Sequence, residues 1–153
     1  MQIVKTAASM ARHNTTGSYG ENVAVAYLED NGFVVIERNW HDGNRHEIDI
    51  VAVKDSEMHI VEVKTRSSDE WQEPQDAVDD KKRMHIVRAA NAYLKLHDVM
   101  RVVHFDILTV VGNDGDCKVT LIEDAFDPHA VKRSTRRRPG YIYKVGSINS
   151  HRN

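Results

Sequence analysis

The sequence predicts an α/β protein, a three-layer sandwich whose mixed central β-sheet is flanked by helices in the order αβββαββ. Three observations support this. A helical apolar pattern over residues 15–31 precedes three stretches rich in β-branched and aromatic residues. A second, longer helical pattern follows from residue 74. Two more strand-like stretches come after it.

The first helix has a signal at each end. Thr15 or Thr16 can cap its start, and Gly32 stands where helices end in the left-handed conformation. The next stretch, FVVIERNW at 33–40, has the composition of a strand. The apolar face of the helix comprises Val23, Ala24, Tyr27 and Leu28.

Residues 46–66, HEIDIVAVKDSEMHIVEVKTR, predict a β-hairpin. One strand is expected near 46–53 and the other near 58–66, joined by the polar turn KDSE. Pro74 then opens the second helix, which runs to about His97, where that histidine is expected to pack or cap. Two strands follow at 102–111 and 117–126. The apolar stripe along one side of the second helix comprises Val78, Ile86, Ala89, Ala90, Tyr93 and Leu94.

Composition and charge divide the chain in two. At 153 residues, 41% apolar and 29% charged, it suits one globular domain and is not of the disordered class. We place that domain at residues 1–128, where 14 basic residues stand against 23 acidic ones, a balance of −9. The tail, 129–153, has seven basic residues and no acidic one. It is a nucleic-acid arm, a solvated extension, or a strip that docks on the acidic domain.

Three absences bear on location. No stretch reaches the roughly 18 apolar residues of a membrane helix, and the start has no sustained apolar segment of a secretory signal. The single cysteine, Cys117, cannot form an internal disulfide. We therefore expect a cytoplasmic protein with no membrane partner.

Three charges stand at unusual places in the hairpin. Because alternate strand residues share a face, Glu62 and Lys64 lie together, and the short turn brings Asp49 opposite them. Two carboxylates a few ångströms apart repel each other unless a cation lies between them. Hard oxygen ligands favour Mg²⁺ or Mn²⁺. Lys64 would orient a water or stabilise negative charge on a phosphate.

The alternative is that these are ordinary solvated strand charges. A cross-strand Asp–Lys pair contributes under about 1 kcal/mol to a sheet, and Glu-x-Lys is common on exposed strands. The stretches IDIVAV and IVEVK are almost continuously apolar, however, as in strands covered on both faces. An acid buried there is costly unless it is paired or metal-bound. The context therefore favours a functional site.

These residues resemble a known nuclease motif. Asp49, then Glu62-Val63-Lys64 a dozen residues on, behind a helix carrying Glu21, resembles the PD-(D/E)xK core of type II restriction enzymes and Holliday-junction resolvases. A closer resemblance is to the YraN family of bacterial proteins, which is uncharacterised but grouped with endonucleases. It covers about residues 17–126 and is carried by GSYGENVAVAYLEDNGF, ERNW, EIDIVAV, VEVKTR and FDILTV.

The resemblance implies a restriction-endonuclease-like core and a DNA-cleaving site. Asp49, Glu62, Glu21 and the backbone carbonyl of Val63 would hold Mg²⁺ or Mn²⁺, and Lys64 would be the catalytic lysine. Resolvase-like relatives act as dimers, so a homodimer is implied as well. One departure is a histidine, His46, where the family usually has glycine before EID, and the tail lies outside the resemblance.

Other residues are candidates for nucleic-acid contacts or support. Glu47 shares the strand face of Asp49, either as a supporting group or as a solvated charge. Lys81, His85 and Arg88 form either a solvated helix face or a ridge that follows phosphates. In the tail the candidates are Arg136, Arg137 and Arg138.

The sequence thus predicts a metal-dependent nuclease that hydrolyses phosphodiester bonds in DNA, with branched or structured DNA as a candidate substrate. Two alternatives stay open. One is a nucleic-acid-binding module of the same fold that has no catalytic activity. The other is a protein-interaction domain whose basic tail meets an acidic partner.

Overall fold

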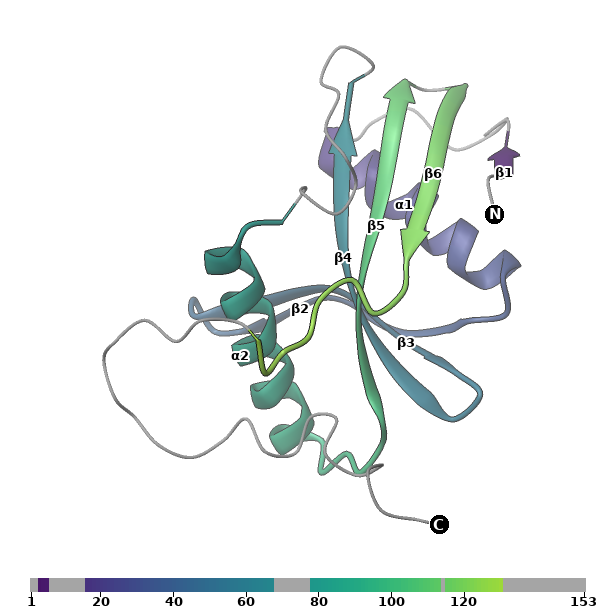
Figure 1. Ribbon diagram of the computed structural model, residues 1–153. Coiled ribbons are helices and arrows are strands. Elements are labelled where there is room, and N and C mark those ends of the chain that lie inside the picture. Colours follow the sequence, from purple (N-terminus) through teal and green to yellow (C-terminus); the bar gives the residue numbers. More distant parts are fainter. Residues whose placement is uncertain (1–2, 6–15, 68–77, 114, 131–153) are drawn as a thin grey trace.

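The computed structural model describes residues 3–5, 16–67, 78–113 and 115–130, in which two helices accompany six strands (Figure 1). The predicted strands and helices are all present, and their ends agree within a few residues except at the start of the second helix. The elements are β1 (Ile3–Lys5), α1 (Thr16–Asp30), β2 (Val34–Asp42), β3 (His46–Lys54), β4 (Glu57–Arg66), α2 (Asp80–Leu96), β5 (Val103–Asn113) and β6 (Asp116–Ile122).

The strands form one mixed sheet in the order β1-β6-β5-β4-β3-β2. The β4–β5 pair is parallel, and every other neighbouring pair is antiparallel. This confirms the predicted α/β class with a mixed central sheet. Strand β1, which pairs Ile3 with Val119 of β6, was not predicted. Three residues are too few to show a periodicity, so only pairing with β6 reveals this strand.

Two separate apolar clusters make the fold a three-layer structure, one on each face of the sheet. Ile86, Ala90 and Tyr93 of α2 pack with Ile60 of β4 in one cluster. Ala24 and Leu28 of α1 pack with the opposite face in the other. Figure 1 shows α1 crossing behind β5 and β6, with α2 beside the sheet at the left. Burying a helix stripe on each face removes apolar surface from water, which is the main stabilising contribution of such a fold.

The β3–β4 hairpin has its turn within the predicted stretch KDSE, where two residues join the strands. Asp55 and Ser56 both have positive φ, 50° and 66°, as a type I′ turn requires. The ladder pairs Val51 with Ile60, and both belong to the α2-side cluster. Val51 of β3 therefore shares the α2 face with Met58 and Ile60 of β4. Ile48 lies in the same cluster, so the alternation of faces along β3 is interrupted between Ile48 and Val51, at Asp49 and Ile50. This register decides where the hairpin charges lie.

The helix ends agree with the sequence signals in three of four places. Helix α1 starts at Thr16, and Gly32 has the expected positive φ of 86°. His97 is the C-cap of α2. The predicted start of α2 at Pro74 is wrong, because Val78 and Asp79 are not helical. The side chain of Asp79 accepts a hydrogen bond from the Lys82 amide at 2.8 Å, so it caps the helix instead.

Gly20 allows α1 to lie close against β4. A β-carbon added at Gly20 would overlap Oγ1 of Thr65 and lie 3.0 Å from its Cβ. We expect Gly20→Ala to lower the free energy of unfolding by about 1–3 kcal/mol, although alanine is the better helix former. Urea denaturation measures this. The double variant with Thr65→Ala should recover part of the loss, and a Gly20→Ala protein as stable as wild type would contradict the close approach.

Two further predictions concern the membrane and the basic tail. Neither helix in the described segments is long and apolar enough to cross a membrane. The tail from residue 131 onward lies outside the described residues. The division of the chain at residue 128 therefore stays a prediction.

Candidate active site

Asp49 lies immediately beyond the last backbone pair between β3 and β4. The ladder extends from the turn to the pair Ile50–Val61. There Asp49 Oδ2 accepts a hydrogen bond from the backbone amide of Val63 at 2.8 Å. The carboxylate thus satisfies an amide that a backbone carbonyl would otherwise satisfy. It is held beside β4 at the height of Glu62.

Glu62 is a buried carboxylate with two lysine partners. Its residue is 4% exposed, on the α2 face with Ile60. A buried charge is costly unless it is paired. Lys64 Nζ lies 3.2 Å from Oε1 of Glu62, and Lys82 Nζ lies 3.1 Å from the same oxygen. The sheet and α2 therefore contribute one ammonium group each to this carboxylate.

Lys82 was missed by the sequence analysis, which singled out its neighbour Lys81. Its Nζ also lies 3.5 Å from Oε1 of Glu47. Burial lowers the pKa of Lys82, but attraction and a hydrogen bond to Glu62, with the nearby Asp49 and Glu47, outweigh burial and raise it. The ammonium therefore stays charged. A signal was available, because Lys82 precedes Ile86 by four residues and so continues the apolar stripe.

Asp49 has the most perturbed acidity at this site. Burial raises its pKa from 3.8 to about 7, with a further contribution from the charge of Glu62. The Val63 amide and Lys82 act in the opposite direction, and Glu21 adds a smaller upward contribution. Lys82 and the Val63 amide thus do not fully compensate burial and the charge of Glu62. Such perturbed carboxyl groups are characteristic of functional sites.

Glu21 approaches from the other layer. It belongs to α1, and its Oε2 accepts a hydrogen bond from Nδ2 of Asn39 at 2.8 Å. Asn39, in β2, has a positive φ of 48°, a conformation that asparagine tolerates better than most residues. The structure therefore brings Asp49, Glu62 and Lys64 together. Glu21 acts on Asp49 through its charge and is positioned by Asn39, which the sequence analysis also missed.

Asp49 and Glu62 are suited to hold a divalent cation as a pair. Among the residues that the structure describes, no group of three or more His, Cys, Asp or Glu side chains could hold a metal ion. Mg²⁺ is commonly bound by one or two carboxylates, with water and substrate phosphate as the remaining ligands. Burial and the charge of Glu62 both disfavour the ionised form of Asp49, and a cation beside the two carboxylates would offset both effects. The donor set therefore fits Mg²⁺ or Mn²⁺.

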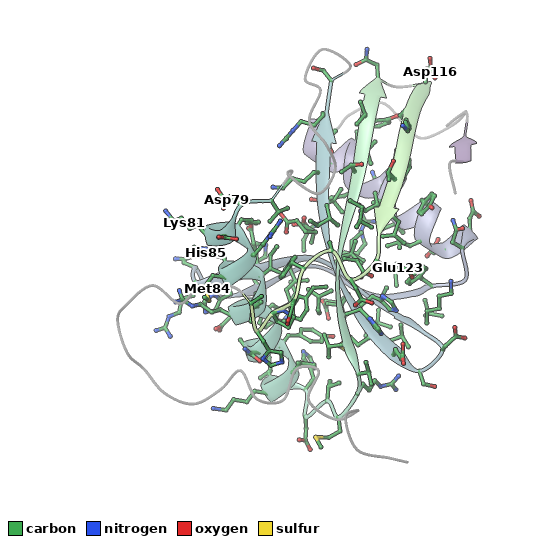
Figure 2. All side chains as sticks on the ribbon, in the orientation of Figure 1. Asp79, Lys81, Met84, His85, Asp116 and Glu123 are labelled. Atoms are coloured by element: carbon green, nitrogen blue, oxygen red, sulfur yellow. The ribbon has the colours of Figure 1, made fainter. Side chains whose placement is uncertain are left out.

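The other predicted residues lie around this pair or outside the described segments. Glu47 has a side chain 57% exposed and an ion pair with Lys82, so it supports a site residue while contacting solvent. Lys81, His85 and Arg88 are exposed on α2 (Figure 2 labels the first two at its outer side), and their contact with nucleic acid stays a prediction. The tail residues Arg136, Arg137 and Arg138 lie outside the described segments.

Comparison with known proteins gives the family. A model of the uncharacterised protein family UPF0102 matches residues 20–110, a span that contains every site residue described above. The chain belongs to UPF0102. This confirms the predicted membership of the YraN family, which is the same family. Because UPF0102 is uncharacterised, membership does not itself assign an activity.

Relatives in UPF0102 match nearly their whole length. A UPF0102 protein of Bacteroides thetaiotaomicron is 50% identical over 119 residues, 78% of this chain and 98% of the relative. One from Flavobacterium psychrophilum is 40% identical over 117 residues, 76% of this chain and 98% of the relative. One from Porphyromonas gingivalis is 40% identical over 132 residues, 85% of this chain and 96% of the relative.

Proposed function

We propose that this UPF0102 chain is a divalent-metal-dependent nuclease that hydrolyses phosphodiester bonds in DNA. One observation carries the proposal. Glu62 is buried and contacts the ammonium groups of Lys64 and Lys82, and Asp49 lies beside it, hydrogen-bonded to the Val63 amide. Paired carboxylates beside fixed cations suit the cleavage of a phosphodiester.

Each group has a separate role in this proposal. Asp49 and Glu62 hold the cation, which when bound polarises the phosphate and lowers the pKa of a coordinated water. Lys64 and Lys82 stabilise the negative charge that grows on the phosphate oxygens. Both ammonium groups are held in place by Oε1 of Glu62, so little reorganisation is needed. The Val63 amide keeps Asp49 oriented toward its neighbour.

Cleavage assays test the proposal directly. Purified protein would be incubated with linear, single-stranded, flapped and four-way DNA in the presence of Mg²⁺ or Mn²⁺. We expect wild type to cleave at least one of these, and Glu62→Gln and Lys64→Ala to lose about 10²-fold or more in rate. Glu123→Gln, at an exposed site beyond β6, is the matched control and should keep full activity. Equal cleavage by Lys64→Ala and wild type would contradict the assigned role.

A second candidate is a nucleic-acid-binding module without catalysis. It is supported by the two ion pairs of Glu62, which already give this carboxylate positive partners without a metal. Binding of DNA at low salt with no cleavage of any substrate would favour this module. Absence of binding even at low salt would contradict both functions. Sedimentation of the same samples would test the homodimer that resolvase-like proteins form.

A further inference from the structure

A pocket of about 430 Å³ lies beside the candidate active site, between the β2–β3 turn and α2. Figure 1 shows this turn reaching toward α2. The residues that matter for its chemistry come from both elements. They are His41, Arg45, His46, Glu47, Lys82 and His85.

The charge of this pocket suits an anion. Arg45 and Lys82 are cationic, and the one acidic group, Glu47, lies 3.5 Å from Lys82 Nζ. An arginine can give a phosphate two parallel hydrogen bonds, and a lysine adds a compact charge. Three imidazole rings, those of His41, His46 and His85, also line the pocket. The Nδ1 atom of His46 is buried and has no hydrogen-bond partner among the described residues, which is rare in folded proteins.

The size and position of the pocket restrict the class of ligand further. The volume falls within the range of roughly 300–1,000 Å³ that is typical of small-molecule sites and exceeds what a single phosphate requires. His41, Arg45 and His85 are exposed, so the pocket is open to solvent and a strand can continue out of it. Lys82 is shared, because it lines the pocket and also lies 3.1 Å from Oε1 of Glu62.

We propose that this pocket binds one nucleotide of a nucleic-acid strand, adjacent to the phosphate that the candidate active site acts on. Arg45 and Lys82 bind the phosphate of that nucleotide, and the imidazole rings of His46 and His85 pack against its base or sugar. The position next to a scissile phosphate rests on the proposed function. The ligand class rests on the pocket itself.

The test uses the full chain without divalent cations, so that no cleavage is needed. A deoxynucleoside 5′-monophosphate would be titrated while NMR follows the histidine ring signals. We expect saturable shifts for His41, His46 and His85, with those of His59 on the far face of the sheet unchanged. Arg45→Ala should weaken binding about 10-fold, since it removes a charge-assisted hydrogen bond. Lys118→Ala, at an exposed position of β6, is the matched control and should bind like wild type.

Two parallel titrations define the ligand. The unphosphorylated nucleoside should bind far more weakly than the nucleotide, and inorganic phosphate should also bind more weakly. Equal affinity for nucleoside and nucleotide would overturn the role of Arg45 and Lys82. Equal affinity for phosphate and nucleotide would overturn the role of the imidazole rings. Unchanged affinity in Arg45→Ala would overturn the site as a whole.

The experiments can contradict the nucleotide-binding pocket and the nuclease activity independently of each other. Saturable nucleotide shifts in a protein that cleaves no DNA would support the pocket and contradict the nuclease. Cleavage with the same KM in wild type and Arg45→Ala would overturn the pocket and leave the nuclease intact. A higher KM in Arg45→Ala with kcat nearly unchanged is the result expected if both are right.

Discussion

The Asp49→Asn protein is expected to be more stable than wild type and unable to cleave DNA. Asp49 is held beside the buried Glu62 by the Val63 amide, and an asparagine oxygen can accept the same hydrogen bond. The substitution therefore keeps the contact and removes one of two repelling charges. Without metal, we expect the free energy of unfolding at pH 8 to rise by about 2 kcal/mol. Stability is often lower where a site is built for function.

The pH dependence of that gain follows from the raised pKa of Asp49. In the folded state the pKa is about 7, against 3.8 for the ordinary group. Between these values the folded protein keeps a proton that the unfolded chain loses, so wild-type stability falls as pH rises through this window. The difference between Asp49→Asn and wild type should therefore be small near pH 4, grow until about pH 7, and then level off. Urea denaturation at a series of pH values measures it.

The same substitution is also expected to weaken the stabilisation of the folded protein by a divalent cation. Mg²⁺ or Mn²⁺ bound by Asp49 and Glu62 stabilises only the folded state, so it should raise the thermal midpoint of wild type. Asp49→Asn should show a much smaller rise. An Asp49→Asn protein that is less stable than wild type at pH 8 would show that the two carboxylates do not repel each other. An equal rise of the thermal midpoint with Mn²⁺ in wild type and in Asp49→Asn would show that the cation binds elsewhere.

The Asp106→Ala protein is expected to lose about 3 kcal/mol of unfolding free energy, because a buried hydrogen-bonded pair is broken from one side. Asp106 is 1% exposed, and its Oδ2 lies 2.6 Å from Nδ1 of His59, which is 5% exposed. Its Oδ1 accepts a hydrogen bond from the backbone amide of Asp124 at 2.9 Å. Without the carboxylate, both partners lose their hydrogen bond in a region packed by Phe33.

A control substitution and a double-mutant cycle test whether the stability loss comes from the His59–Asp106 pair. Glu123→Ala removes an exposed carboxylate one residue before Asp124 (Figure 2 labels Glu123) and should change stability by less than about 0.5 kcal/mol. His59→Ala and the double variant with Asp106→Ala complete a cycle that isolates the pair. If Asp106→Ala costs no more than Glu123→Ala, the buried pair contributes nothing to stability. Cleavage below the thermal midpoint should change little, because His59 lies on the α1 face and Glu62 on the α2 face.

Sequence alone determined much of the frame and the centre of the site. Strand alternation places Glu62 and Lys64 on one face of β4. The short turn brings Asp49 beside Glu62, because a two-residue turn leaves only one register for the hairpin. The ends of α1 were predictable, since capping residues act within a few positions of the chain. Family membership was predictable as well, because several motifs occur in a specific order within the matched span.

Tertiary structure alone decided which lysine of α2 enters the site and how acidic its partner is. The neighbours Lys81 and Lys82 look alike in sequence, but packing of the Ile86 stripe on the sheet turns only Lys82 toward Glu62. The pKa of Asp49 depends on burial and on charges from other elements. Periodicity is local, whereas the rotation of a helix over a sheet and the desolvation of a carboxylate are set by contacts between distant segments.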